Sequence, residues 1–147
     1  MSHLMRRRRL VIDTSVVVAG LRSRMGASNR LLVLIAEGQL IPLVTTAVFL
    51  EYEEVLRRPE HRLYTGMSDD DVSGFLSAFA SAAEPVEVHF SWRPQLHDVD
   101  DEMILEAAVN GNADALITHN VLDFRSAALS FSIPVLTPAE LLKELKK

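Results

Sequence analysis

Short apolar, β-branched runs alternate along this sequence with stretches of helical periodicity. The runs, which we predict to be strands, are 10–12, 41–44, 86–90, 115–118 and 133–136. Strands that alternate with helices form βαβ units, and right-handed crossovers between them give a parallel sheet covered on both faces. We therefore predict an α/β fold, a three-layer α/β/α sandwich around a mainly parallel five-stranded sheet.

Start and stop signals place helices between these strands. The predicted helices are 28–38, 46–58, 69–84, 99–110 and 138–145. Ser28 is expected to cap the first, Ser68 precedes three aspartates that suit a first helical turn, and Thr137–Glu140 is a capping box. With 147 residues and no linker, we expect one domain over 10–147, after a basic lead at 1–9 that partly derives from cloning.

Composition excludes several classes of protein. With no cysteine, the chain has no disulfide framework, thiolate nucleophile or cysteine-type zinc site. The longest apolar runs, such as 16–19 and 31–36, are far shorter than the ~20 residues that a membrane helix needs. The start lacks the apolar stretch of a signal peptide. We expect a cytoplasmic protein without a membrane partner.

The net charge of −5 argues against binding nucleic acid through bulk electrostatics. The charge is uneven, however: residues 1–62 hold ten basic and six acidic groups (+4), whereas 63–147 hold five basic and 14 acidic groups (−9). One half is suited to phosphate and the other to cations, although an imbalance of this size also arises by chance.

Polar side chains follow two of the predicted strands. Asp13 comes directly after the first strand, and Thr118, Asn120 and Asp123 lie at or just beyond the end of the fourth. Because ligands collect at the carboxyl ends of parallel strands, this edge is the expected site. Taken singly, Asp13 and Asp123 read equally well as helix caps, and Asn120 as a turn residue.

Acidic residues also lie on two predicted helices. Projection at 100° per residue places Glu51 and Glu53 on opposite borders of an apolar face and turns Glu54 away, toward an ion pair with Arg58. This geometry excludes Glu54 but does not choose between Glu51 and Glu53.

The run Asp98–Glu102 precedes the apolar face of the next helix. Projection puts Asp101 near the middle of that face, with Asp100 and Glu102 toward its borders or beyond. A carboxylate on a buried face is costly unless it is paired or bound to metal. A simpler reading is compatible with this one: Asp98 caps the helix and Asp101 belongs to its first turn.

Asp13, Asp101 and Asp123 thus lie at ends of elements that a parallel sheet brings to one edge. Clustered carboxylates repel one another unless a cation is present. Oxygen ligands without cysteine or a histidine pair favour Mg²⁺ or Mn²⁺ over zinc. Such ions bind substrate phosphates and activate water, so the chemistry indicated is phosphodiester hydrolysis.

Four segments resemble, in order and spacing, the successive motifs of PIN-domain proteins, and the likeness covers nearly the whole chain. The segments are Val11–Ser15, Glu51–Leu56, Asp98–Ala108 and Thr118–Phe124. The sequence is most similar to prokaryotic PIN proteins of the VapC-like ribonuclease type, which are toxins of type II toxin–antitoxin systems.

The resemblance implies a Mg²⁺- or Mn²⁺-dependent endoribonuclease with an acidic quartet, and it selects Glu51 over Glu53. The implied quartet is Asp13, Glu51, Asp101 and Asp123. Asp13, Asp101 and Asp123 would be metal ligands, with Glu51 holding a second metal or orienting water. The further residues that would support or line the site are Thr14, Ser15, Asp98, Thr118 and Asn120. Such proteins commonly form homodimers and are silenced by a small antitoxin protein.

For RNA contact, the candidates are Arg22, Arg24, Arg30 and the run Arg6–Arg9. The alternative is a solvated tail and a polar helix face. Trp92 is a candidate for base stacking but more often packs in a core, and His119 reads as a turn residue. The alternative function is a non-catalytic PIN-like RNA-binding or scaffold module, which the asparagine at 120 favours. A haloacid-dehalogenase-type phosphatase is disfavoured because Ser15 stands where that class has a second aspartate.

Overall fold

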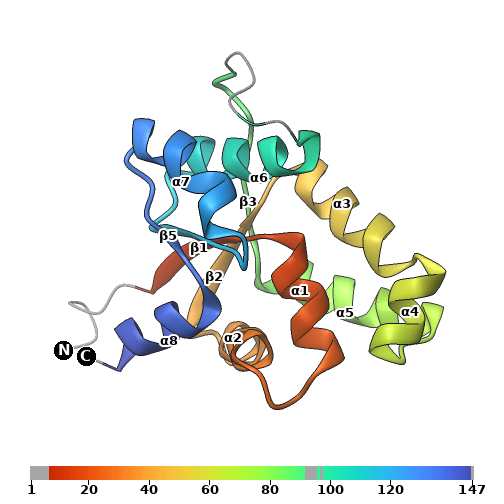
Figure 1. Ribbon diagram of the computed structural model, residues 1–147. Coiled ribbons are helices and arrows are strands. Elements are labelled where there is room, and N and C mark those ends of the chain that lie inside the picture. Colours follow the sequence, from red (N-terminus) through yellow and green to blue (C-terminus); the bar gives the residue numbers. More distant parts are fainter. Residues whose placement is uncertain (1–6, 92–95, 97, 147) are drawn as a thin grey trace.

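The computed structural model describes residues 7–91, 96 and 98–146, and it contains one five-stranded sheet (Figure 1). All four strand pairings are parallel, and the spatial order is β3-β2-β1-β4-β5. The strands are β1 (Arg8–Ile12), β2 (Leu40–Val44), β3 (Glu84–Pro85), β4 (Ala115–Ile117) and β5 (Val135–Leu136). The predicted α/β class and the five-stranded parallel sheet are confirmed.

Helices cover both faces of this sheet. They are α1 (Thr14–Arg22), α2 (Ala27–Ala36), α3 (Thr46–Leu56), α4 (Pro59–Thr65), α5 (Asp69–Ala82), α6 (Val99–Asn110), α7 (Val121–Ser130) and α8 (Pro138–Leu145). Figure 1 shows α6 and α7 on one side of the sheet and α1, α2 and α8 on the other. None of the described helices combines the length and apolarity needed to cross a bilayer.

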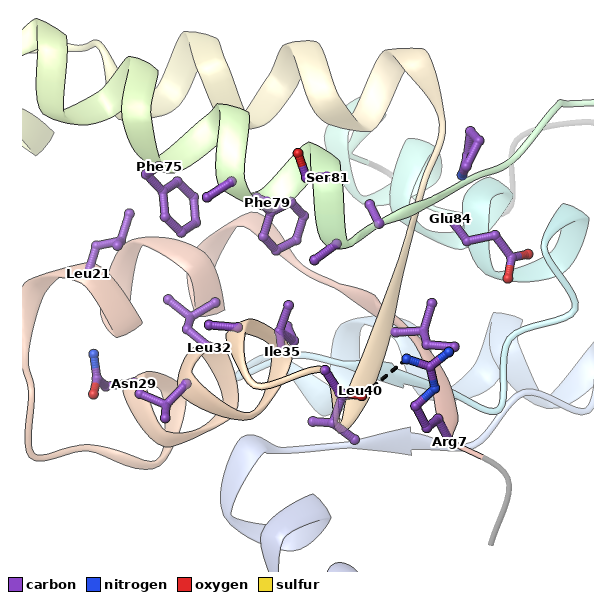
Figure 2. A pocket seen from close by; sticks show the side chains of 18 residues that line it. Arg7, Leu21, Asn29, Leu32, Ile35, Leu40, Phe75, Phe79, Ser81 and Glu84 are labelled. Carbon is purple, nitrogen blue, oxygen red and sulfur yellow. Dashed lines mark hydrogen bonds between the residues drawn. The ribbon is translucent and has the colours of Figure 1, made fainter. Parts of the chain in front are cut away.

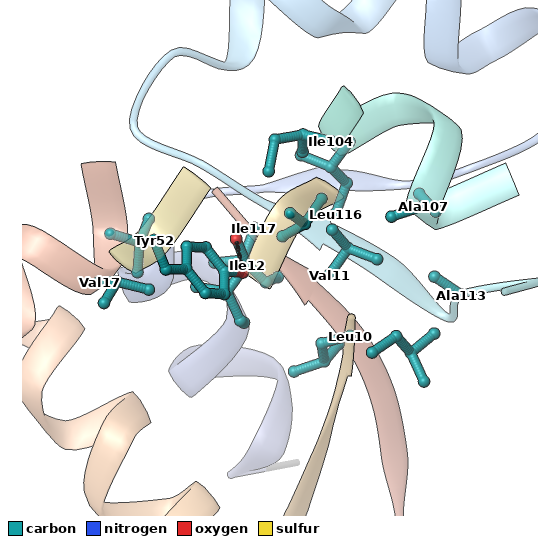
Figure 3. Packing of buried hydrophobic residues seen from close by; sticks show 14 of the residues in the cluster. Leu10, Val11, Ile12, Val17, Tyr52, Ile104, Ala107, Ala113, Leu116 and Ile117 are labelled. Carbon is teal, nitrogen blue, oxygen red and sulfur yellow. Dashed lines mark hydrogen bonds between the residues drawn. The ribbon is translucent and has the colours of Figure 1, made fainter. Parts of the chain in front are cut away.

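The central strand β1 is buried on both faces, which fixes its position (Figure 3). Leu10, Val11 and Ile12 are all fully buried. Figure 3 shows Val11 beside Leu116 of β4 and close to Ala107 of α6. Such continuous apolar runs are typical of parallel strands enclosed between helix layers. The residue that follows this strand, Asp13, is therefore held on a rigid support.

The prediction of a third strand at residues 86–90 is wrong. β3 comprises only Glu84–Pro85, and its pairing with β2 ends at Val44, whose carbonyl still accepts the N–H of Val86 at 2.8 Å. Beyond Val44 the neighbouring chain turns into α3, so residues 86–90 have no strand to pair with. The side chain of Asn110 instead accepts hydrogen bonds from the N–H groups of His89 (2.9 Å) and Phe90 (2.7 Å).

Most predicted helices are confirmed with shifted ends, but one predicted cap is wrong. Gly26, not Ser28, is the N-cap of α2. Ser28 lies inside the first turn, and its hydroxyl is within hydrogen-bonding distance of the His119 ring, at 3.1 Å. The capping box of α8 is confirmed, because Thr137 Oγ1 accepts the N–H of Glu140 and the Glu140 carboxylate accepts the N–H of Thr137.

The strand order places a topological switch point, where ligands usually bind in such sheets, at one edge of the sheet. The chain leaves β1 toward β2 on one side and returns to β4 on the other, so the connections diverge at the carboxyl ends of β1 and β4. The N–H of Asp13 donates to the carbonyl of Ile117 at 2.9 Å, which joins the two strand ends. This is the edge at which the sequence places its acidic residues.

Candidate active site

Asp13 is the anchor of this edge. Its side chain makes no capping hydrogen bond to α1, although the residue occupies the N-cap position. Instead, its Oδ2 atom accepts hydrogen bonds from the hydroxyls of Ser15 (3.0 Å) and Thr118 (2.7 Å). Only 6% of Asp13 is exposed. Asp13 is thus the N-cap of α1 through its backbone, whose carbonyl accepts the N–H of Val16, but its carboxylate does not cap the helix and is oriented by two hydroxyls.

Thr118 and Tyr52 support Asp13 from inside the protein. Thr118 is fully buried, and its hydroxyl oxygen also accepts the N–H of Asn120 at 2.9 Å. The Tyr52 hydroxyl donates to the carbonyl of Ile12, the residue before Asp13. Burial, and then the charge of Asp13, raise the pKa of Tyr52, so this hydroxyl remains a donor. Tyr52 has no place in the predicted site, because its burial reads from the sequence as ordinary core packing.

Asp101 faces this carboxylate from the first turn of α6. Asp98 caps the helix, as predicted, by accepting the N–H groups of Asp100 (2.8 Å) and Asp101 (3.4 Å). Burial raises the pKa of Asp101 from 3.8 to about 6. The negative charges of Asp13, Asp98, Asp123 and Asp100 add to this effect, in that order. The structure thus brings Asp13, Asp101 and Asp123 into one electrostatic cluster.

Glu51 approaches the cluster from α3. It is buried, with 8% exposed, and its pKa is raised to about 6. Burial is the main cause, followed by the charge of Asp100, and the two carboxyl groups are also within hydrogen-bonding reach of each other. Asp100 is therefore a member of the site that is absent from the predicted set. Projection places it at the border of the apolar face of α6, which is where α3 packs.

The two other glutamates of α3 lie outside the cluster. Glu53 is half-buried and pairs with Arg57 at 3.5 Å. Glu54 is exposed and pairs with Arg58 at 2.8 Å, which confirms the predicted ion pair. Packing of α3 therefore separates Glu51 from Glu53, which projection alone left equivalent.

The remaining candidates lie at the rim of the acid cluster. Thr14 is the first residue of α1 and is half-buried. Asn120 is the N-cap of α7 but makes no side-chain capping hydrogen bond, and its side chain is exposed. Asp123 is exposed in the first turn of the same helix. Both side chains are therefore accessible to a ligand.

The cluster carries uncompensated negative charge. In the described part of the chain, neither Lys nor Arg forms a salt bridge with Asp13, Asp101 or Asp123. Arg58 offsets the raised pKa of Glu51 only in part. No three Asp, Glu or His side chains among the described residues already converge closely enough to hold a metal ion.

The three candidate RNA-binding arginines lie in different places. Arg22, at the end of α1, stacks over the ring of Tyr64 at 3.9 Å. Arg24 is exposed. Arg30 lines a cavity near the start of β1, where Arg8 pairs with Glu144 at 2.7 Å. Residues Arg6 and Trp92 lie outside the described part of the chain.

The most spacious cavity described is remote from the acids (Figure 2). It measures about 970 Å³ and lies between α2 and α5. Figure 2 shows Leu32 and Ile35 of α2 facing Phe75 and Phe79 of α5 across it. None of the carboxylates of the cluster lines it, so this cavity is separate from the candidate site.

Comparison with known proteins decides the family. The family model described as "PIN domain" matches residues 9–122, more than half of the chain. This chain belongs to the PIN domain family. The matched span contains Asp13, Glu51 and Asp101 and ends one residue before Asp123. A search of curated proteins finds no match. PIN domains are typically nucleases that use divalent metals, which agrees with an acidic cluster at a sheet edge.

Proposed function

We propose that this PIN-domain protein is a Mg²⁺- or Mn²⁺-dependent endoribonuclease and the toxin component of a toxin–antitoxin pair. The observations that carry the enzymatic part are the PIN-domain match over residues 9–122 and the buried Asp13 carboxylate at the carboxyl end of β1. The raised pKa of Asp101, to which the charges of Asp13 and Asp123 contribute, supports it. Three carboxylates from three elements share one small region without a described cationic partner. A divalent cation is the simplest group that stabilises such an arrangement.

The donor set fits a hard cation. It consists of carboxylate oxygens with a neighbouring hydroxyl and amide, and the chain has no cysteine. The two hydroxyl hydrogen bonds that the structure shows for the Asp13 carboxylate are both to its Oδ2 atom. Asp13, Asp101 and Asp123 would hold the ion. Once bound, the ion would activate water and stabilise charge on the scissile phosphate.

The protein's own groups have separate tasks in this proposal. Ser15 and Thr118 orient the Asp13 carboxylate, because each donates a hydrogen bond to its Oδ2 atom. Burial and then the charge of Asp100 raise the pKa of Glu51 to about 6, so Glu51 is suited to accept a proton from the attacking water. The family resemblance implies that Glu51 holds a second metal or orients water, and the role of proton acceptor is added to it here.

The test is a cleavage assay on single-stranded and structured RNA with Mg²⁺, with Mn²⁺ and with EDTA. We expect cleavage that requires the metal and that Asp13→Asn abolishes. Glu51→Gln should reduce the turnover by about 10²-fold or more, as expected for loss of general base catalysis. Its matched control is Glu53→Gln on the same helix, which should retain turnover. Cleavage that persists in Asp13→Asn would refute the proposal.

One alternative function has an observation in its favour. A non-catalytic RNA-binding or scaffold module would need no preformed metal group, and none is present among the described residues. Asn120 also reduces the negative charge at the rim, where a carboxylate would strengthen metal binding. The two functions differ in the assay above, because a scaffold binds RNA but neither cleaves it nor depends on Asp13.

The toxin role and the partners rest on the resemblance of the sequence motifs. From this resemblance we propose that the chain forms a homodimer and is inhibited by a small antitoxin protein. We expect a neighbouring gene that encodes a short DNA-binding protein. Its product should co-purify with this chain and inhibit cleavage. If expression of the active nuclease leaves growth unchanged, the toxin role is refuted while the nuclease chemistry stands.

A further inference from the structure

A second, smaller groove adjoins the acid cluster, and we call it the Arg22–His119 groove. Its volume is about 390 Å³. Its walls are the end of α1, the start of α2, the loop between β4 and α7, and the start of α8. Its polar lining includes Arg22, Ser28, His119 and Thr137. Two of these walls follow directly from the carboxyl ends of β4 and β5. The groove therefore lies at the same edge of the sheet as the acids.

The groove and the cluster share one piece of backbone. Thr118 bonds Asp13 through its hydroxyl, and His119 is the next residue. Consecutive Cα atoms are about 3.8 Å apart. The His119 ring, however, does not join the acids, because it contacts the hydroxyl of Ser28 at 3.1 Å. Residues 118 and 119 thus form a wall with the acidic cluster on one side and the groove on the other.

The chemistry of the groove is the opposite of that of the cluster. No Asp or Glu occurs among the described residues that line it, and Arg22 supplies a positive charge. Two planar groups are already oriented: the Arg22 guanidinium lies over the Tyr64 ring, and Ser28 holds the His119 ring. Proteins recognise unstacked RNA bases by stacking them on His rings and Arg planes. A duplex does not offer such free base faces.

We propose that the Arg22–His119 groove binds one nucleotide of a single-stranded RNA, next to the phosphodiester bond held at the acid cluster. The Arg22 guanidinium and the His119 ring bind its base or phosphate. This inference rests on the proposed function, and it adds the binding site for the substrate. The acidic cluster would repel phosphate on its own, so an adjacent groove without carboxylates gives the strand a favourable path.

The test measures binding of a fluorescein-labelled single-stranded RNA of mixed sequence by fluorescence anisotropy. EDTA is present, so that cleavage does not consume the probe. Arg22→Ala and His119→Ala should each raise the Kd about tenfold, the effect of losing one stacking contact. Lys143→Ala is the control. Lys143 is exposed on α8, and its substitution removes one positive charge outside the groove, as Arg22→Ala does inside it. Its Kd should change no more than about twofold.

A further variant, His119→Gln, keeps a hydrogen-bonding group for Ser28 but removes the ring, and it should bind as weakly as His119→Ala. In Mn²⁺, the Arg22 and His119 variants should raise the KM for cleavage more than they lower kcat. Three results would refute RNA binding in the groove. They are wild-type affinity in the Arg22 and His119 variants, an equal loss of affinity in Lys143→Ala, and no RNA binding by the wild type. Loss of Asp13-dependent cleavage would instead overturn the proposed function, so the two failures are distinguishable.

Discussion

Replacing Asp101 by asparagine should stabilise the metal-free protein while it removes metal binding. The pKa of Asp101 is raised from 3.8 to about 6, so the folded state holds the proton more tightly than the unfolded chain does. The ionised carboxylate therefore destabilises the fold. A difference of roughly two pKa units corresponds to about 3 kcal/mol at most, since each unit is worth about 1.36 kcal/mol. Solvent screening of a half-exposed group reduces this to about 1–1.5 kcal/mol.

The stability difference between Asp101→Asn and wild type should depend on pH. Above pH 6 the cost of ionised Asp101 is fully present, so Asp101→Asn should unfold at about 2–6 °C higher than wild type at pH 7.5 in EDTA. As the pH falls from 6 toward 4, wild-type Asp101 becomes protonated and the difference should vanish. Thermal unfolding followed by circular dichroism at several pH values measures this.

The control for Asp101→Asn is Asp70→Asn in the first turn of α5. Asp70 is exposed, and its substitution removes a favourable interaction with the helix dipole, so it should lower stability slightly. Adding Mn²⁺ should raise the unfolding temperature of wild type and leave Asp101→Asn unchanged. A destabilised Asp101→Asn in EDTA at pH 7.5, or a difference that does not change with pH, would contradict the electrostatic argument.

Three further predictions concern residues around the site. Thr118→Val should lower the free energy of unfolding in urea by about 2 kcal/mol, because it removes a buried hydrogen bond to the Asp13 carboxyl group, and a loss under about 0.5 kcal/mol would contradict this role. Asn120→Asp should tighten Mn²⁺ binding in a calorimetric titration by adding a carboxylate at the rim, and unchanged affinity would place residue 120 outside the metal site. Gly20→Ala should destabilise the fold, because the added Cβ would lie 2.6 Å from a side-chain carbon of Leu32 in α2. Its control, Gly74→Ala, has open space around the added Cβ and should raise the free energy of unfolding by about 0.5–1 kcal/mol. Equal effects of the two substitutions would refute the close contact at Gly20.

The sequence predicts the sheet well because its strands are enclosed on both faces. Apolar runs such as Leu10–Ile12 can be read without knowledge of the neighbours. The third strand could not be placed this way, because the end of β3 is set by where β2 stops, at Val44. Helix α4, which begins at Pro59, could not be predicted either, because it buries none of its residues and so has no apolar periodicity.

The candidate site was predictable in outline for a similar reason. Asp13 and Asp101 follow from strand ends and from the apolar face of one helix. The sequence could not predict that Asp100 lies near Glu51, because their proximity depends on how two helices pack. The hydrogen bond of Tyr52 to the backbone beside Asp13 likewise depends on tertiary packing, and periodicity shows only that its ring is buried.

The most direct test of the acid cluster as a metal centre is a calorimetric titration of the wild type and Asp101→Asn with Mn²⁺ at pH 7.5. We predict saturable binding to the wild type, and an affinity at least tenfold lower in Asp101→Asn, because one of three carboxylate ligands is lost. Equal affinity in the two proteins, or no binding to the wild type, would contradict the assignment of the acid cluster as a metal-dependent nuclease site.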